Sequence, residues 1–440
     1  MKTTFLTEDF LLESPLAREV YHGHVEGLPV VDYHNHLDVR TLGQVAADIG
    51  VLWVASDPYK HRAMRMAGEP ERVVTGGASS REKFDAWART LPKTLGNPLF
   101  HWSCLEMKQV FGLDEVPDPS SADRIWEACN AALPTGVAVL ERFRVKRLST
   151  SDDLLDDVSL HARVPRVRVT PSLRGDSILS LRKPWLERLG AVSDLEAFLE
   201  AVRSRLDVFA AAGCRIADHA LDDGWTYVPT SFDEAARLYA AGEADARLRS
   251  FLLHWLGTEY ARRGWVLLLH IGALRSTSSR LRTLSGPAGG YAALGSGCDI
   301  RSLCTLLDTL EASGRLPRCI LFNLNPSDNA ALATLTGSFA AEDGAPKLQF
   351  GPAWWYNDHL AGIEANLETL SAYSLLPLSV GMTTDSRSVL SFSRHDYFRR
   401  ILCNFLASKA VRGQLPADAD LLGRVAADIA CSNAEHWIDG

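Results

Sequence analysis

Two histidines one residue apart, His34 and His36, follow a short apolar run that begins at Val30. Side chains at positions i and i+2 of a strand point to the same side, so both imidazoles can face one point as the strand ends. Two neutral imidazole nitrogens that converge in this way suit Zn²⁺ or a similar divalent ion. A bare His-x-His pair also occurs at exposed strand ends, so the rest of the chain must decide between the two interpretations.

Polar and aromatic side chains also follow the other apolar runs of the chain. They are Ser151-Asp152-Asp153, Arg174, Asp218-His219, His270, Asn323 with Asn325, Trp354, and Asp385 with Arg387. Each one alone could have a structural role, such as a helix cap at Asp218 or a hydrogen-bonded core histidine at His270. Because they recur at the ends of successive apolar runs, we expect them to share one rim and to form a site.

Three of these side chains predict a metal centre. His34, His36 and Asp385 can supply three ligands to a divalent cation and leave positions open for substrate or water. His270 could be a fourth ligand, or it could form a hydrogen bond with substrate. We expect zinc as the metal.

Fixed positive charge on the same rim predicts an anionic substrate. Arg174, Arg275 and Arg387 are guanidinium groups, and a guanidinium binds a carboxylate through two parallel hydrogen bonds. The whole chain has a net charge of −8 and no basic block, so an anion would need such local arginines, and a nucleic-acid surface is not expected. A metal with arginines therefore indicates an oxygen-rich, carboxylate-bearing small molecule.

The elements that must position these residues are apolar runs that alternate with amphipathic helical stretches. Besides the run from Val30, β-type runs occur at 145–150, 164–173, 214–219, 265–273, 318–324, 347–354 and 376–383. Continuous apolar strands that alternate with helices indicate a parallel sheet covered on both faces. Eight such units favour an α/β fold of the (β/α)₈ TIM-barrel type, whose chemistry lies at the carboxyl ends of the strands. A doubly wound open sheet is the alternative.

A long stretch interrupts this alternation after the first strand. Residues 37–144 are too many for a simple strand-to-helix connection, and Ser79 with Glu82 forms a capping box before a helical pattern. We therefore predict a helical insert. The expected organisation is 1–36 for the N-terminal segment and first strand, 37–144 for the insert, and 145–440 for the remaining barrel and C-terminal helices.

The composition is that of an ordinary globular protein, with 23% charged and 46% hydrophobic residues. No signal-peptide core and no apolar run of membrane-spanning length is visible, so no membrane contact is expected. The eight cysteines include no Cys-x-x-Cys pair and are typical of buried free thiols in a reducing compartment. We expect a cytoplasmic protein, and the sequence is compatible with a homo-oligomer.

Several motifs resemble those of a known family. Asp32-Tyr33-His34-Asn35-His36-Leu37 resembles the first-strand motif of the amidohydrolase superfamily. Longer stretches are similar to the uronate isomerase (glucuronate isomerase) family within it: 59–65, 96–102, 269–275, 349–358 and, above all, Gly381-Met382-Thr383-Thr384-Asp385-Ser386-Arg387-Ser388 with 394–400. The resemblance extends over nearly the whole chain.

This resemblance implies an aldose–ketose isomerase that interconverts D-glucuronate with D-fructuronate and D-galacturonate with D-tagaturonate, on a distorted barrel with a helical insert. It implies that His34, His36 and Asp385 bind the metal. It also implies the following substrate and proton-transfer set: Tyr59, Arg174, Asp218, His270 and Arg387. Tyr59 lies inside the insert, and only the resemblance points to it.

Two departures from the family pattern concern substrate preference. Pro58 precedes Tyr59 where another polar residue is usual, and Gly175 follows Arg174 where a proline is usual. Neither removes a functional side chain.

Two other functions remain open from the residues alone. The same metal site could activate water in a metal-dependent hydrolase of a carboxylate-bearing substrate. A sugar-acid binding protein without turnover is the second alternative.

Overall fold

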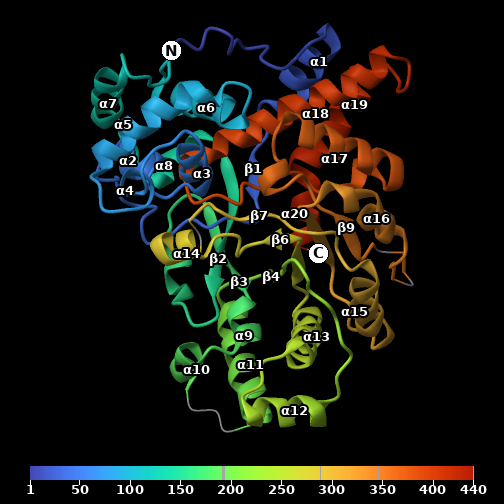
Figure 1. The fold of residues 1–440 in the computed structure, drawn as a ribbon. Coiled ribbons are helices and arrows are strands. Elements are labelled where there is room, and N and C mark those ends of the chain that lie inside the picture. The colour runs from blue at the N-terminus through green and yellow to red at the C-terminus, as the bar shows by residue number, and fades with distance from the viewer. Residues whose placement is uncertain (191–193, 288, 342, 345, 440) are drawn as a thin grey trace.

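A parallel β-sheet whose strands follow chain order is the centre of the fold (Figure 1). The computed structural model describes residues 1–190, 194–287, 289–341, 343–344 and 346–439. Within these residues the sheet has seven strands: β1 (Val30–Asp32), β2 (Val145–Asp153), β3 (Arg168–Arg174), β4 (Ile216–Leu221), β5 (Val266–Ile271), β8 (Cys319–Asn323) and β9 (Leu348–Phe350). The strand order never reverses, as it would in a doubly wound open sheet. The distorted TIM-type barrel expected from the sequence is confirmed.

The prediction of an eighth strand at 376–383 is wrong. Leu376–Leu378 is a turn of 3₁₀ helix, and the residues up to Asp385 are not in a strand. Asp385 N–H donates to the His34 carbonyl (3.0 Å), but His36 N–H donates to the carbonyl of Ser386 (2.8 Å), one residue beyond the partner that a parallel ladder requires. The backbone of Asp385 has a φ of 46°, which breaks the ladder register at this point.

The irregular segment nevertheless occupies the place of an eighth strand between β9 and β1. On the β1 side it makes the two backbone hydrogen bonds just described, and on the β9 side Gln349 Nε2 donates to the carbonyl of Leu378 (3.0 Å). The strand predicted at 347–354 is also shorter than expected and ends at Phe350. Pro352 has no N–H with which to extend the ladder. Trp354 therefore lies in the loop after β9.

Seven helices separate β1 from β2, where the sequence predicts the insert. They are α2 (Ile49–Trp53), α3 (Pro58–Met66), α4 (Glu71–Val74), α5 (Ser80–Thr90), α6 (Pro98–Phe111), α7 (Ala122–Ala131) and α8 (Gly136–Arg142), all within the described residues. The predicted capping box of Ser79 and Glu82 is present at the start of α5. In Figure 1 these helices lie together at the upper left, coloured blue to cyan. The division into units at 36 and 144 stays a prediction.

The remaining helices surround the other strands. Before β1 lies α1 (Pro15–Val20), and between β3 and β5 lie α9 (Asp176–Ser180), α10 (Lys183–Leu189), α11 (Leu195–Ala211), α12 (Phe232–Ala241) and α13 (Ala246–Arg262). The later elements are the short pair β6 (Ala273–Leu274) and β7 (Ala293–Leu294), then α14 (Ser279–Ser285), α15 (Ile300–Ala312), α16 (Asn329–Thr334), α17 (Leu360–Tyr373), α18 (Ser393–Val411), α19 (Ala419–Ala427) and α20 (Asn433–Asp439). In Figure 1 the green helices α9–α13 extend below the sheet, and the orange and red helices cover its right side.

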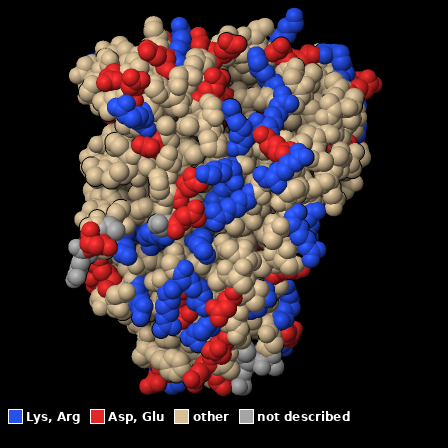
Figure 2. Space-filling model, turned by 180° about the vertical axis from the view of Figure 1, so that it is seen from behind, with Lys and Arg blue, Asp and Glu red and all other residues tan. Residues whose placement is uncertain are grey.

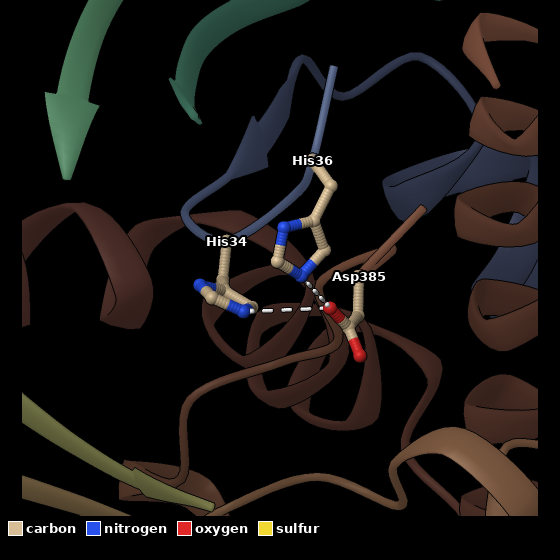
Figure 3. A group of neighbouring side chains, drawn as sticks. All are labelled: His34, His36 and Asp385. Atoms are coloured by element: carbon tan, nitrogen blue, oxygen red, sulfur yellow. Dashed lines mark ion pairs between the residues drawn. The ribbon is translucent and has the colours of Figure 1, made fainter. Parts of the chain in front are cut away.

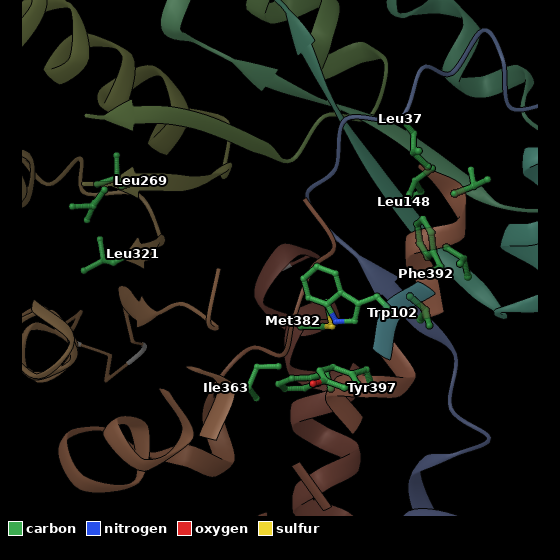
Figure 4. Packing of buried hydrophobic residues seen from close by; sticks show 14 of the residues in the cluster. Leu37, Trp102, Leu148, Leu269, Leu321, Ile363, Met382, Phe392 and Tyr397 are labelled. Atoms are coloured by element: carbon green, nitrogen blue, oxygen red, sulfur yellow. The ribbon is translucent and has the colours of Figure 1, made fainter. Parts of the chain in front are cut away.

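One apolar core joins the insert to the barrel. Figure 4 shows Leu269 of β5 and Leu321 of β8 in the same cluster as Trp102 of α6. The guanidinium of Arg394 on the barrel helix α18 lies over the Trp102 ring, 4.8 Å from its centroid. The insert is thus packed on the barrel through buried side chains, and this packing sets where its residues lie relative to the strand ends.

The surface has charges of both signs. On the face shown in Figure 2, lysine and arginine side chains lie next to aspartate and glutamate across the middle of the molecule. Among the described helices, none combines the length and apolar character required to cross a bilayer.

Candidate active site

The two histidines of the His-x-His motif lie in the loop directly after β1. The strand ends at Asp32, so neither histidine belongs to it, contrary to the sequence prediction. The loop is held from both sides: Asn35 N–H donates to the Ser149 carbonyl (3.2 Å), and His36 N–H donates to that of Ser386 (2.8 Å). These hydrogen bonds, and not strand geometry, determine where the imidazoles point.

The imidazoles converge on one carboxylate oxygen (Figure 3). His36 Nε2 lies 3.0 Å and His34 Nε2 lies 3.4 Å from Asp385 Oδ1. The two rings are nearly perpendicular, with centroids 5.3 Å apart. The metal-ligand set predicted from the sequence is therefore brought together in space from two segments about 350 residues apart.

The donor atoms of these residues fit a divalent ion. The ligand atoms of His34, His36 and Asp385 all lie within 4.8 Å of one another. Two ligands of a tetrahedral zinc ion, each bound at about 2.1 Å, are separated by about 3.4 Å, which is close to the two nitrogen-to-oxygen distances here. A second possible set, His34 with Asp218 and His270, shares one histidine with the first.

Asp32 joins the two segments that present the ligands. Its buried carboxylate accepts hydrogen bonds from Asn35 Nδ2 (3.0 Å), Thr383 Oγ1 (3.0 Å) and Thr384 N–H (2.9 Å). His395 Nε2 of α18 lies 2.9 Å from it. Burial raises the pKa of Asp32, but the hydrogen bond and charge of His395, together with the hydrogen bonds from Asn35 and Thr384, outweigh burial and hold the pKa below its ordinary value. Sequence reasoning quoted Asp32 in the motif and assigned it no role.

Asp385 is oriented through both of its oxygens. Oδ1 faces the imidazoles, while Oδ2 accepts a hydrogen bond from the indole N–H of Trp354 (2.6 Å). Burial raises the pKa of this carboxyl, but the hydrogen bonds and the charges of His34 and His36 together outweigh burial and hold the pKa well below its usual range. Asp385 is therefore ionised at neutral pH.

Asp218, His270 and Arg174 come from three consecutive strands. Arg174 and Asp218 are register partners across β3 and β4. Asp218 Oδ2 lies 3.7 Å from both Arg174 Nη1 and His270 Nδ1. Burial lowers the pKa of His270 well below its ordinary value, so its ring is neutral, and His270 Nε2 has no hydrogen-bond partner among the described residues.

Tyr59 reaches the site from the insert. It lies in the first turn of α3, where Asp57 accepts from its backbone N–H (2.9 Å) as the helix N-cap. Its hydroxyl donates to Asp358 Oδ2 (3.4 Å). Burial raises the pKa of the phenol well above its ordinary value, and the negative charge of Asp358 adds to this shift.

The three predicted arginines differ in their partners. Arg174 contacts Asp176 (3.0 Å) in addition to Asp218, and Arg275 is paired with Asp222 (2.8 Å). Arg387 forms no ion pair with any described residue. Its guanidinium is therefore the one of the three that needs no displacement before it can pair with a substrate carboxylate.

A single cavity of about 780 Å³ collects these groups. The predicted residues that line it are His34, His36, Tyr59, Arg174, His270, Arg275, Trp354, Asp385 and Arg387. Asp218 does not line it and is 0% exposed, so it lies beneath the cavity.

Sequence reasoning missed several lining residues. Asp176, Asp222 and Trp355 face the cavity, together with the exposed Arg182 and Arg249. Asp176 follows Arg174 by two residues, so the end of β3 could have indicated it. Asp222 likewise comes directly after β4. The others lie in loops or on helices, where no local pattern points toward the strand ends.

The chain is similar to known proteins over nearly its whole length. The sequence profile of the glucuronate isomerase family matches residues 1–438. A curated uronate isomerase of Salmonella arizonae is 40% identical to the chain, and the alignment covers 99% of each. The crystal structure of a uronate isomerase from Thermotoga maritima superposes with a TM-score of 0.92 at 28% identity, over 99% of each chain. The glucuronate isomerase of Caulobacter crescentus has the same fold, with a TM-score of 0.90 at 24% identity over 99% of this chain and 97% of its own.

These matches extend from the first residues of the chain to the last helix, and they include every segment that contributes to the cavity. Because a family profile covers nearly the whole length and a curated relative is 40% identical, the assignment does not depend on a single motif. The chain therefore belongs to the glucuronate isomerase family of uronate isomerases.

Proposed function

We propose that this uronate isomerase interconverts D-glucuronate with D-fructuronate and D-galacturonate with D-tagaturonate. The observation that supports this most is the composition of one cavity. An ionised carboxylate beside two imidazoles, a protonated phenol and a guanidinium without an ion pair to any residue the structure describes all line it. These are the groups that an aldose–ketose isomerisation of a sugar acid needs.

The reaction moves a proton from C2 to C1 of the open-chain sugar and a second proton between the two oxygens. Its intermediate is an enediol, whose developing negative charge needs stabilisation. The C2 proton is only weakly acidic, so a positioned base is required as well.

Asp385 is the proposed base. Because its pKa is low, the carboxylate is ionised and ready to accept a proton, and Trp354 fixes the orientation of Oδ2. A low pKa also makes it a weak base, so the acceleration depends on a short approach to C2 and on stabilisation of the enediol. Asp385 would return the proton to C1.

His34, His36 and Asp385 would hold a divalent ion, which we propose is zinc. When bound, such an ion supplies Lewis-acid stabilisation of negative charge on a substrate oxygen. His270 is proposed to form a hydrogen bond with a substrate hydroxyl through its unpartnered Nε2, and not to be a ligand of this ion.

Tyr59 is proposed to move the second proton between O1 and O2. Its raised pKa keeps the phenol protonated, so it can donate to one oxygen while it accepts from the other. Asp218 is proposed to orient His270 and Arg174 from beneath the cavity, and through His270 to assist opening of the sugar ring.

Recognition of the substrate carboxylate is assigned to Arg174 and Arg387. Arg174 is held in place by Asp176 and Asp218, whereas Arg387, which has no ion-pair partner in the described part of the chain, is proposed to pair with the substrate carboxylate. Arg275 and Trp354 are proposed to form the part of the cavity wall next to these arginines and to contact the substrate there. The partner is a small-molecule hexuronate, and a cytoplasmic location and a homo-oligomeric state remain predictions.

The experiment that tests this function is an NMR time course. The enzyme is incubated with D-glucuronate and, separately, with D-galacturonate in D₂O, with and without a chelator. We expect the ketose signals of fructuronate and tagaturonate to appear, and chelation to slow them. Cleavage of amides or lactones without any ketose would instead support the hydrolase alternative.

A further inference from the structure

Two buried charged residues lie directly behind Tyr59 and outside the cavity. Asp358 is 9% exposed and Arg394 is 3% exposed. Asp358 Oδ2 accepts from the Tyr59 hydroxyl at 3.4 Å and from Arg394 Nη1 at 2.7 Å. Neither Asp358 nor Arg394 lines the cavity, so neither can contact substrate directly.

Arg394 also contacts the segment that presents Asp385. Its Nη2 donates to the carbonyl of Thr384, the residue before Asp385. The same guanidinium lies over the ring of Tyr59, 5.7 Å from its centroid, and over that of Trp102 at 4.8 Å. One side chain of α18 thus connects the phenol from the insert with the backbone next to the carboxylate from the barrel.

A buried ion pair at this place needs a reason other than stability. Removing two charges from water costs several kcal/mol per ion, and apolar replacements of such pairs are often neutral or stabilising. The pair does provide a fixed position for the Tyr59 hydroxyl. In the absence of substrate the Tyr59 hydroxyl donates to Asp358, which fixes where the phenol oxygen lies. Rotation of the O–H about the C–O bond then lets the same oxygen donate to substrate, and Arg394 limits movement of both the ring and the carboxylate.

We propose that Asp358 and Arg394 are positioning residues. They hold the Tyr59 hydroxyl at the cavity edge, in a fixed position relative to Asp385. This inference rests on the proton-transfer role given to Tyr59 above. It predicts that Asp358 affects turnover only through the Tyr59 hydroxyl.

The chain offers a matched control on the same helix. Asp396 of α18 accepts a hydrogen bond from the Tyr21 hydroxyl and pairs with Arg400 Nε at 3.1 Å, and Arg400 lies over the Tyr21 ring at 4.4 Å. This second set has the same three residue types in the same arrangement, and none of its members lines the cavity. Asp396→Asn therefore measures what loss of such a contact does to the protein in general.

The test is a double-mutant cycle on kcat at saturating glucuronate, with Tyr59→Phe, Asp358→Asn and the two combined. We expect Asp358→Asn to lower kcat by about 10-fold to 100-fold with KM within about twofold, because a misplaced group loses rate and not ground-state binding. In the Tyr59→Phe background the same change should alter kcat by less than about twofold, since the group it positions is already gone. Asp396→Asn should lower the melting temperature and leave kcat within about twofold.

Three results would overturn the inference. They are multiplicative losses in the combined variant, a folded Asp358→Asn protein with wild-type kcat, and an equal loss of kcat in Asp396→Asn. Failure of the wild-type enzyme to form ketose would count against the proposed function itself and would be seen before any variant is made.

A second variant keeps the test valid if Asp358→Asn leaves Arg394 unpaired and the protein does not fold. Asp358→Asn combined with Arg394→Gln removes both charges and avoids a lone buried guanidinium. The same cycle with Tyr59→Phe then applies, with the same expected non-additivity.

Discussion

At the scale of single residues, the two carboxylate oxygens of Asp385 make different contacts. Oδ1 lies between the imidazoles, and Oδ2 is held by Trp354. A carboxylate used in this way must be ionised before the reaction begins, and both contacts must hold it in place. Its φ of 46°, rare for a residue other than glycine, indicates that the surrounding hydrogen bonds impose the conformation.

Asp385→Asn is expected to lower kcat about 10²-fold to 10⁴-fold, because an amide cannot accept the C2 proton. Ketose formation followed by NMR measures the loss, and the metal content of the purified variant shows whether binding of the ion was lost as well. Near-normal turnover in this variant would contradict the assignment of Asp385 as the base.

Arg174→Lys retains the charge but not the planar fork that Asp176 and Asp218 hold in place. We expect KM for glucuronate to rise about tenfold with a smaller effect on kcat, since the change removes binding to a part of the substrate that does not react. Initial rates over a range of glucuronate concentrations give both constants. Equal Michaelis constants for the two proteins would argue against a carboxylate clamp.

At the scale of elements, the segment from Ser379 to Asp385 replaces a strand by side-chain hydrogen bonds. Thr383 Oγ1 accepts from His34 N–H (2.8 Å) and lies within hydrogen-bond distance of the His34 carbonyl (2.7 Å) and Asp32 (3.0 Å). These contacts substitute for the ladder that Asp385 interrupts. The Thr383 hydroxyl therefore contributes to the closure of the barrel beside the candidate metal site, together with the backbone hydrogen bonds of Asp385 and His36.

Thr383→Val removes that hydroxyl with little change of shape and leaves buried polar groups of His34 and Asp32 without this partner. We expect the free energy of unfolding to fall by about 1–3 kcal/mol. Chemical denaturation monitored by tryptophan fluorescence measures it.

The neighbouring residue is the control. Thr384 is equally buried, but its hydroxyl has no hydrogen-bond partner within the described residues, so Thr384→Val should change stability by less than about 0.5 kcal/mol. Equal losses in the two variants would show that the hydroxyl of Thr383 does not close the barrel.

At the scale of the whole molecule, the proposed ion connects the beginning of the barrel with its end. His34 and His36 follow β1, and Asp385 precedes α18, so an ion bound between them would join the two edges of the curled sheet. A ligand that binds only the folded state stabilises it by mass action.

Removal of the ion with a chelator is therefore expected to lower the melting temperature. At an ion concentration 1,000 times the dissociation constant, the stabilisation is about 4 kcal/mol. Differential scanning calorimetry of the wild type and of a His34→Asn/His36→Asn variant makes the comparison, and Zn²⁺ should restore only the wild type. Identical melting temperatures with and without chelator in the wild type would exclude a stabilising ion.

The sequence by itself determined the class of fold, the helical insert and the residue types at the rim. Apolar runs, helical periodicity and capping residues such as Ser79 involve only residues close together in the sequence. They can therefore be recognised from the sequence alone. The convergence of His34, His36 and Asp385 was predictable for a related reason. In a parallel barrel all strands end on the same rim, whatever lies between them.

Only the tertiary structure decided the backbone conformation of residues 376–383, the burial of Asp218 beneath the cavity and the contacts of Tyr59. The run 376–383 has the composition of a strand, but hydrogen bonds with Asp32 and His34, about 350 residues away, stabilise a different conformation. Tyr59 faces the strand ends because α6 packs against α18, and because Arg394 of α18 and Asp358, which precedes α17, lie behind the phenol. Such contacts depend on which surfaces meet after folding, and no local pattern encodes them.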